Sequence, residues 1–246
     1  MKYARSLGVL LVGLLVLGGC DTSINSSIVI PDGESRSNSL SSVNGDISIG
    51  EDCTIEGTSR SVNGSVKVGN RSSVEDLTVV NGSIRTGEGV SVDGNVESVN
   101  GTIELGNGSG VSGEVSTVNG SIVLNQTVVQ RDVLTMHGDI ELRDKSVVKG
   151  DIVIGGKIGV IETENKTSVV KVEDNVGVIV IDDKKRDSNR PIEIEVTGGS
   201  IIEGNVMVKR NVEVRLILSD GGKVLGQVDG AEVIDKGEAQ PALDSD

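Results

Sequence analysis

The chain has 246 residues and a formal net charge of −14, and loss of Lys2 and Arg5 with an N-terminal signal would bring that charge to −16. Such an excess of negative charge repels phosphate backbones, so the composition excludes nucleic acid as a partner. Phe and Trp are absent and the single Tyr is Tyr3, which excludes an aromatic platform for sugars or cations in a processed chain.

Residues 1–19 have the form of an export signal. Lys2 and Arg5 precede an apolar run at 7–17, which is too short to span a bilayer as a permanent helix. The signal ends at Leu17-Gly18-Gly19-Cys20, which resembles the bacterial lipobox, in which the cysteine is acylated and becomes the new N-terminus. The alternative is an ordinary signal followed by an unmodified cysteine.

We expect lipidation of Cys20, because Leu stands three places before it and Gly directly before it. Two or three acyl chains on one residue anchor a protein stably in a membrane. Residues 20–23 then form a short anchor segment, and Ile24 is the first residue expected in the core. This predicts an exported protein held at the inner or outer membrane of a bacterial cell envelope.

A nine-residue motif follows, SVNGDISIG at 42–50, which returns four times with small changes. Its asparagine recurs every 18 or 19 residues, at Asn44, Asn63, Asn81, Asn100 and Asn119, and the same step reaches Asn25 before them and His137 after them. The positions one before and three after this residue are apolar in every repeat, with polar residues between them. Alternation at period two predicts strands with one buried face, and the longer period predicts a stacked repeat.

The fold class predicted is all-β, a right-handed parallel β-helix of 18–19 residues per coil with roughly 10–11 coils. Regular coils are expected over 24–181, an exposed loop at 182–191, further coils and a cap over 192–235, and a disordered acidic tail at 236–246. In the last coil, Glu213 and Arg215 are expected to guard the open edge of the strand at 212–218 against further pairing.

Within this fold the VNG motif is interpreted as a corner. Its valine is expected to point inward, and its glycine is expected to supply the backbone geometry of a sharp turn. The asparagine amides are expected to form one hydrogen-bonded ladder, which runs through Asn25, Asn44, Asn63, Asn81, Asn100 and Asn119, with His137 in the same position of the next coil. This predicts a structural role for these residues, not a binding or catalytic one.

The repeated VNG coils behind a signal resemble a family of bacterial envelope proteins that are often described as polymer-forming or bactofilin-like. The resemblance covers roughly residues 24–234. It implies a β-helix and little about activity. The signal and the lipobox depart from cytoskeletal bactofilins, which disfavours a cytoplasmic scaffold.

Chemistry-bearing motifs are absent from the sequence, which contains no HExxH, CxxC, P-loop, GxSxG or GGxGxD signature. Asp46 and Asp139 are separated by Ser and Thr in the equivalent positions, and charges of both signs mix in the neighbouring row. We therefore assign no catalytic, cofactor or metal residue and predict that the protein is not an enzyme. Cys53 is expected to be a small buried or corner residue, and one remaining cysteine cannot form an intramolecular disulfide.

Three functions fit these observations. The first is a lipid-anchored structural or interaction scaffold of the envelope. The second is a polysaccharide-binding or polysaccharide-active β-helix, similar to an adhesin, and the third is an ice-binding solenoid, which would need a flat threonine array. The expected partners are the membrane, through the lipid on Cys20, and an envelope protein or polysaccharide. The chain is expected to be a monomer or a dimer joined end to end through its C-terminal coils.

Overall fold

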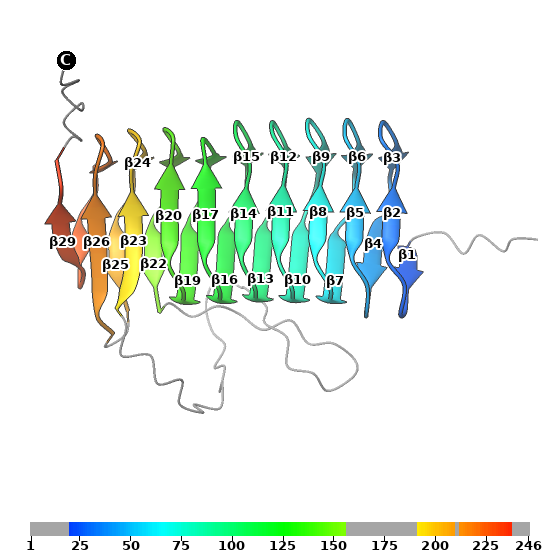
Figure 1. Ribbon diagram of the computed structural model, residues 1–246, viewed down its shortest axis with the longest axis horizontal. Helices are drawn as coiled ribbons and strands as arrows, with labels where there is room; N and C mark the ends of the chain where they lie inside the picture. The colour runs from blue at the N-terminus through cyan, green and yellow to red at the C-terminus, as the bar shows by residue number, and fades with distance from the viewer. Residues whose placement is uncertain (1–19, 156–190, 210–211, 238–246) are drawn as a thin grey trace, which may run out of the picture.

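The computed structural model describes residues 20–155, 191–209 and 212–237 of the chain. These residues contain strands and turns but no helix, and every strand pair is parallel. Successive coils of about 19 residues stack along one axis and build three sheets, which Figure 1 shows as a continuous ladder. The predicted parallel β-helix is thereby confirmed.

Each coil contributes one strand to each sheet, in the order sheet A, sheet B, sheet C. Sheet A holds β1 (Cys20–Ser23), β4 (Ser39–Ser42), β7 (Ser59–Asn63), β10 (Leu77–Asn81), β13 (Val96–Asn100), β16 (Val115–Asn119), β19 (Val133–His137), β22 (Ile152–Ile154), β25 (Val206–Val208) and β28 (Val228–Asp229). Sheet B holds β2 (Ile28–Ile30), β5 (Ile47–Ile49), β8 (Val66–Val68), β11 (Ile84–Thr86), β14 (Ile103–Leu105), β17 (Ile122–Asn125), β20 (Ile140–Arg143), β23 (Ile192–Val196), β26 (Val214–Leu218) and β29 (Glu232–Asp235). Sheet C holds β3 (Ser35–Arg36), β6 (Thr54–Ile55), β9 (Ser73–Val74), β12 (Ser91–Val92), β15 (Gly110–Val111), β18 (Val128–Val129), β21 (Val147–Val148), β24 (Ile201–Ile202) and β27 (Lys223–Val224).

The core is a set of aliphatic rows that run the length of the stack. In sheet B the residue three after the motif asparagine is buried in coil after coil, and equivalent residues are paired, as Ile47 is with Val66. Each row continues because a parallel register places equivalent side chains about 4.8 Å apart. One coil alone has no partner for its ladder hydrogen bonds, so the repeat must be stacked to be stable.

The valine of the VNG motif lies outside the core cluster in all five copies, although Val80 and Val118 are buried at 4% and 1% exposure, so the prediction that it points into the core is wrong. In β7, Ser59 and Ser61 are buried while Val62 is only partly buried, and in β10 the core contains Leu77 and Val79. The inward residue is the one two places before the asparagine. The hydroxyls of Ser61, Ser98 and Thr117 each donate to a glycine carbonyl of the preceding coil, as Ser61 does to Gly45 at 2.9 Å, and Ser42 donates to the carbonyl of Ser26.

The glycine of the motif is required by close stacking, and the predicted turn geometry is wrong for most copies. A Cβ on Gly101 would lie 1.8 Å from the carbonyl oxygen of Gly82, and one on Gly120 would lie 2.1 Å from that of Gly101. Among the glycines of the five VNG copies, only Gly82 has a positive φ, of 152°. The glycines therefore form a row in which each backbone contacts the next without room for a side chain.

The sequence register fails at two places. Val129 pairs with Val111 in the buried row of sheet C, although it stands ten residues after Asn119 whereas Val111 stands eleven after Asn100. The period of 18 residues places Ile158 next to Ile140, but Ile140 pairs with Ile122 on one side and with Ile194 on the other. The predicted coils over 156–181 and most of the predicted loop at 182–191 lie outside the described residues.

The described sheets contain ten, ten and nine strands, against the ten to eleven coils expected. The last strand of sheet B is β29, not the strand at 212–218, since Arg215 of β26 pairs with Glu232. The predicted guard of the open edge by Glu213 and Arg215 is therefore wrong. The C-terminal end of the stack is formed instead by β27, β28 and β29, with the apolar side chains of Val224, Val228 and Val233 at the ends of the core rows.

Candidate functional site

Cys20, the residue for which lipidation is expected, belongs to the first described coil. It pairs with Ser39 in β1, so no separate anchor segment lies between this residue and the coils that follow. Ile24 is 69% exposed and lies outside the core, which corrects its expected place as the first core residue. An acyl group on Cys20 would therefore be attached to the β-helix itself.

The motif asparagines form one continuous hydrogen-bonded row on the surface. In each step Nδ2 donates to Oδ1 of the asparagine in the preceding coil, with distances of 2.7 Å for Asn44 to Asn25 and 2.9 Å for Asn63 to Asn44. The row continues through Asn81, Asn100 and Asn119 at 2.9, 3.0 and 3.0 Å. His137 is paired with Asn119 in the register of the sheet, so it occupies the next position of the row.

A second row of polar side chains caps the neighbouring turn. Asp46 Oδ1 accepts a hydrogen bond from the backbone of Ser65 at 2.7 Å, and Asp139 Oδ1 accepts one from the backbone of Glu193 at 2.9 Å. Because these carboxylates bond the backbone of the next coil, both act as structural caps. Within the described ranges, no group of three or more His, Cys, Asp or Glu side chains could hold a metal ion.

Two half-buried carboxylates with raised pKa values lie in β13 and directly before β16. Burial raises the pKa of Glu97, with a further contribution from the charge of Asp76. Burial, together with the charges of Glu97 and Asp132, raises the pKa of Glu114 to about 7. Sequence reasoning missed both residues, because two glutamates 17 positions apart carry no signal until the register places them in adjacent coils.

Cys53 is buried in a row that otherwise contains several Ser and Thr side chains. Its thiol occupies the position that a hydroxyl has in those coils. Its backbone N–H donates to Ser72 Oγ at 3.0 Å, and its own Sγ donates to the carbonyl of Pro31 at 3.1 Å. The same pattern recurs two coils further on, where Val90 N–H donates to Ser109 Oγ. The expectation of a small buried residue is confirmed by this position.

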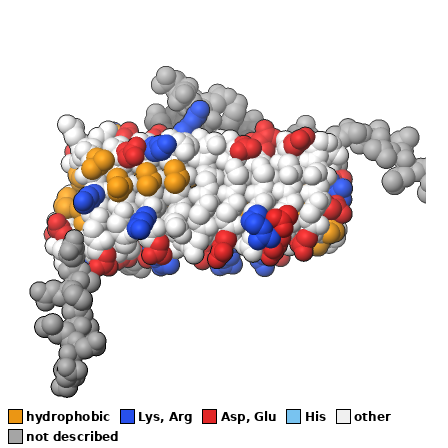
Figure 2. Space-filling view, turned by 90° about the horizontal axis from the view of Figure 1, so that it is seen from above, with side chains coloured by type: hydrophobic (Ala, Val, Ile, Leu, Met, Phe, Trp, Pro, Cys, Tyr) orange, Lys and Arg blue, Asp and Glu red, His pale blue; other side chains and the backbone are white. Residues whose placement is uncertain are grey.

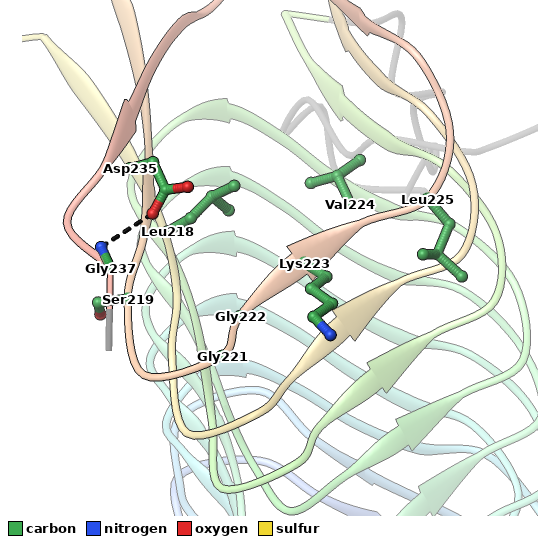
Figure 3. A pocket seen from close by; sticks show the side chains of 9 residues that line it. All are labelled: Leu218, Ser219, Gly221, Gly222, Lys223, Val224, Leu225, Asp235 and Gly237. Carbon is green, nitrogen blue, oxygen red and sulfur yellow. Dashed lines mark hydrogen bonds between the residues drawn. The ribbon is translucent and has the colours of Figure 1, made fainter. Parts of the chain in front are cut away.

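A cavity of about 360 Å³ opens at the last coil (Figure 3). It is lined by Leu218, Ser219, Gly221, Gly222, Lys223, Val224, Leu225, Asp235 and Gly237. Asp235 accepts a hydrogen bond from Gly237 N–H at 2.9 Å, and Lys223 is exposed. The corner of a further coil would stack at this position. The lining of the cavity combines aliphatic side chains with one cation, Lys223, and one anion, Asp235.

The surface along the stack is mixed in character. On the outer face of sheet C, the equivalent positions are Thr54, Ser73 and Ser91 toward the N-terminal end and Val128 and Val147 toward the C-terminal end. Figure 2, which views the molecule over this sheet, shows hydrophobic side chains gathered near the C-terminal end and charges spread over the remainder. A continuous threonine array, as an ice-binding face needs, is not formed by this row.

In the part of the chain that the structure describes, no helix has both the length and the apolar character needed to cross a bilayer. No protein-family model, curated protein or solved structure matches the chain.

Proposed function

We propose that the chain is a lipid-anchored structural or interaction scaffold of the bacterial cell envelope, without catalytic activity. The observation that carries the proposal is the pairing of Cys20, the last residue of the lipobox-like sequence, with Ser39 in the first described pair of sheet A. A lipid on this residue would be joined to the coils without a flexible tether, so the membrane would hold one end of the stack.

The dimensions of the stack support a spacing role. Ten strands in sheet A at about 4.8 Å per step span about 43 Å from β1 to β28. Continuous aliphatic rows and surface ladders make this a stiff element, because every coil is bonded to both neighbours. Such a scaffold would present its C-terminal coil, with the cavity beside Lys223 and Leu225, at that distance from the anchor.

The proposed partners are therefore the membrane at the N-terminal end and an envelope protein or polysaccharide elsewhere. The edges of β27, β28 and β29, which pair with no further strand in the described part of the chain, also offer a surface for one further copy, end to end. Electron microscopy of the lipidated protein in bilayers tests this part of the proposal. Single particles or pairs are expected, and long unbranched filaments would contradict it.

A polysaccharide-active or polysaccharide-binding protein is the second candidate. The observation that favours it is the pair Glu97 and Glu114, because a carboxyl with a pKa near 7 is suited to proton transfer at neutral pH. Release of reducing ends from envelope polysaccharides, lost in Glu114→Gln and retained in Glu88→Gln, would support this candidate over the scaffold.

Membrane fractionation tests the first candidate. The wild-type chain is expected to remain with membranes at high salt, whereas Cys20→Ser is expected to be released or to stay unprocessed. Retention of processed Cys20→Ser on salt-washed membranes would contradict lipid anchoring.

A further inference from the structure

Two of the most exposed large apolar side chains in the described part of the chain belong to the first coil. Ile24 is 69% exposed and Val29 is 67% exposed. Ile24 follows β1 directly, and Val29 is the middle residue of β2, so the two lie on either side of the corner at 25–27. Together with the attachment point at Cys20, they make an apolar rim around the N-terminal end of the stack.

In the outer row of sheet B, Val29 is followed by four polar or charged residues before the next apolar one, Val123. Along the outer row of sheet B, the next positions are Ser48, Lys67 and Arg85. These polar and charged side chains are stable where they are hydrated. Val29 and Ser48 lie in adjacent coils, so the outer row changes from an apolar to a polar side chain in one step. Such a change is expected where the surroundings of the stack change from lipid to water.

The backbone of the first coil limits how deeply this rim can enter a bilayer. Among the described strands, β1, β2 and β3 are the edges of their sheets, so within the described residues their outward N–H and C=O groups have no strand partner. Unpaired backbone groups are costly in hydrocarbon but are satisfied by water and lipid headgroups. The exposed carboxylates of Asp21 and Asp32 have the same requirement.

We infer that the first coil sits in the headgroup layer of a lipid bilayer, with Ile24 and Val29 inserted beside the acyl chains on Cys20, and that the stack stands on the membrane. The inference rests on the proposed lipidation of Cys20. It adds a lipid surface as the partner of the first coil and an orientation for the stack. Interfacial apolar side chains that flank a lipid anchor fix the angle that the anchor alone would leave free.

Single tryptophans test this orientation, because the chain contains no Trp or Phe and its one Tyr is in the signal. Val29→Trp places the reporter on the rim. Arg85→Trp places it in the same row three strands further along, about 14 Å away. Both positions are exposed, so either side chain is accommodated, and the midpoint of urea unfolding checks that each variant is folded.

The acylated variants, purified from membranes, are reconstituted in phosphatidylcholine vesicles with and without brominated acyl chains. Trp at 29 is expected to show blue-shifted emission and quenching by bromine several-fold stronger than Trp at 85. Equal quenching at both positions would mean that the stack lies along the surface, and absence of quenching at both would mean that the coil is held off the membrane. Either result overturns the inference.

The intact mass of each variant separates this inference from the proposed function. Protein that carries acyl chains but shows no difference between the two reporters contradicts only the seating of the first coil. Protein that carries no acyl chains contradicts the lipid anchor, and the seating that rests on it falls as well.

Discussion

Asn100 Nδ2 donates a hydrogen bond to Asn81 Oδ1 at 3.0 Å, and Asn100 Oδ1 accepts one from Asn119 Nδ2 at the same distance. Asn100 is exposed, so water can replace part of what either bond contributes. The ladder is therefore a surface feature, and a residue in its middle takes part in two bonds that each contribute about 0.5–1.5 kcal/mol.

We expect Asn100→Ala to lower the free energy of unfolding by about 1–2 kcal/mol, because it removes both bonds. The comparison is Asn25→Gly at the end of the row, which loses only the bond from Asn44. Glycine is the proper substitute there because Asn25 has a φ of 67°, at which alanine would add strain of its own. Urea unfolding measures both, and equal losses would contradict a continuous ladder.

Gly101→Ala tests the close stacking of the VNG glycines. The added Cβ would lie 1.8 Å from the backbone oxygen of Gly82, which cannot move without shifting a whole coil. We expect a loss of about 3 kcal/mol or more, at the upper end of the cost of overpacking. Gly110→Ala is the matched control, because its Cβ would meet no atom within 4 Å and its φ is not positive. A similar loss in both variants would show that backbone entropy, not contact, explains the motif.

The period of the sequence was sufficient to predict the parallel β-helix, since Ile47, Val66 and Ile84 recur at the spacing of one coil and are paired in the structure. It was insufficient to predict which face each residue occupies at a corner. Val62 and Ser61 are adjacent, and apolarity suggested that the valine is buried, whereas the serine is inside with its hydroxyl bonded to Gly45. A buried hydroxyl with a backbone acceptor is stable, and sequence alone does not reveal the acceptor.

The candidate site was predicted less completely than the fold. Lipidation of Cys20 stays a prediction, which rests on the local lipobox-like sequence alone. Glu97 and Glu114 were not identified from the sequence, because their burial and mutual repulsion depend on the register of adjacent coils. The register at Ile194 was also beyond the sequence, since apolar residues at 158–160 fit the same period as those that pair with Ile140.

The raised pKa of Glu114 predicts a pH dependence of stability. Its carboxyl has a pKa of about 7 in the folded protein and an ordinary value, near 4.5, when the chain is unfolded. The folded state thus binds the proton more tightly, so stability is greatest below the unfolded pKa and is lost as the pH rises through about 7. The loss is at most about 3 kcal/mol, from 1.36 kcal/mol for each pKa unit.

Glu114→Gln is expected to remove the contribution of Glu114 to that dependence, while the raised pKa of Glu97 keeps its own, and to be more stable than the wild type at pH 8. Glu88→Gln, at an exposed position of the same stack, is the control and should retain the slope of the wild type. Urea unfolding at pH 5 and pH 8 makes the comparison, and a wild-type chain more stable at pH 8 would contradict the burial argument.

Gln126 occupies a turn position at which the backbone is left-handed. Its φ is 47°, and the equivalent residue of the preceding coil, Gly108, has a φ of 71° and donates its N–H to the Gln126 carbonyl. Strain of about 1–2 kcal/mol at a non-glycine residue outweighs the backbone entropy of glycine, about 0.5–1 kcal/mol. Gln126→Gly is therefore expected to raise stability by up to about 1 kcal/mol.

Gln130→Gly provides the control for that variant, because Gln130 is exposed and has no positive φ. It should lower stability by about 0.5–1 kcal/mol. Thermal unfolding of the two variants checks the pair, and a loss of similar size in both would show that the turn is unstrained.

The mass of the N-terminal peptide of the membrane-extracted protein tests the anchor most directly. A peptide that begins at Cys20 and carries a diacylglyceryl group, with or without a third acyl chain, is the result that the account predicts. Such a peptide would place the lipid on the first residue of β1. A peptide that begins at Met1, or one that begins at Cys20 without any acyl group, would contradict the lipid-anchored scaffold.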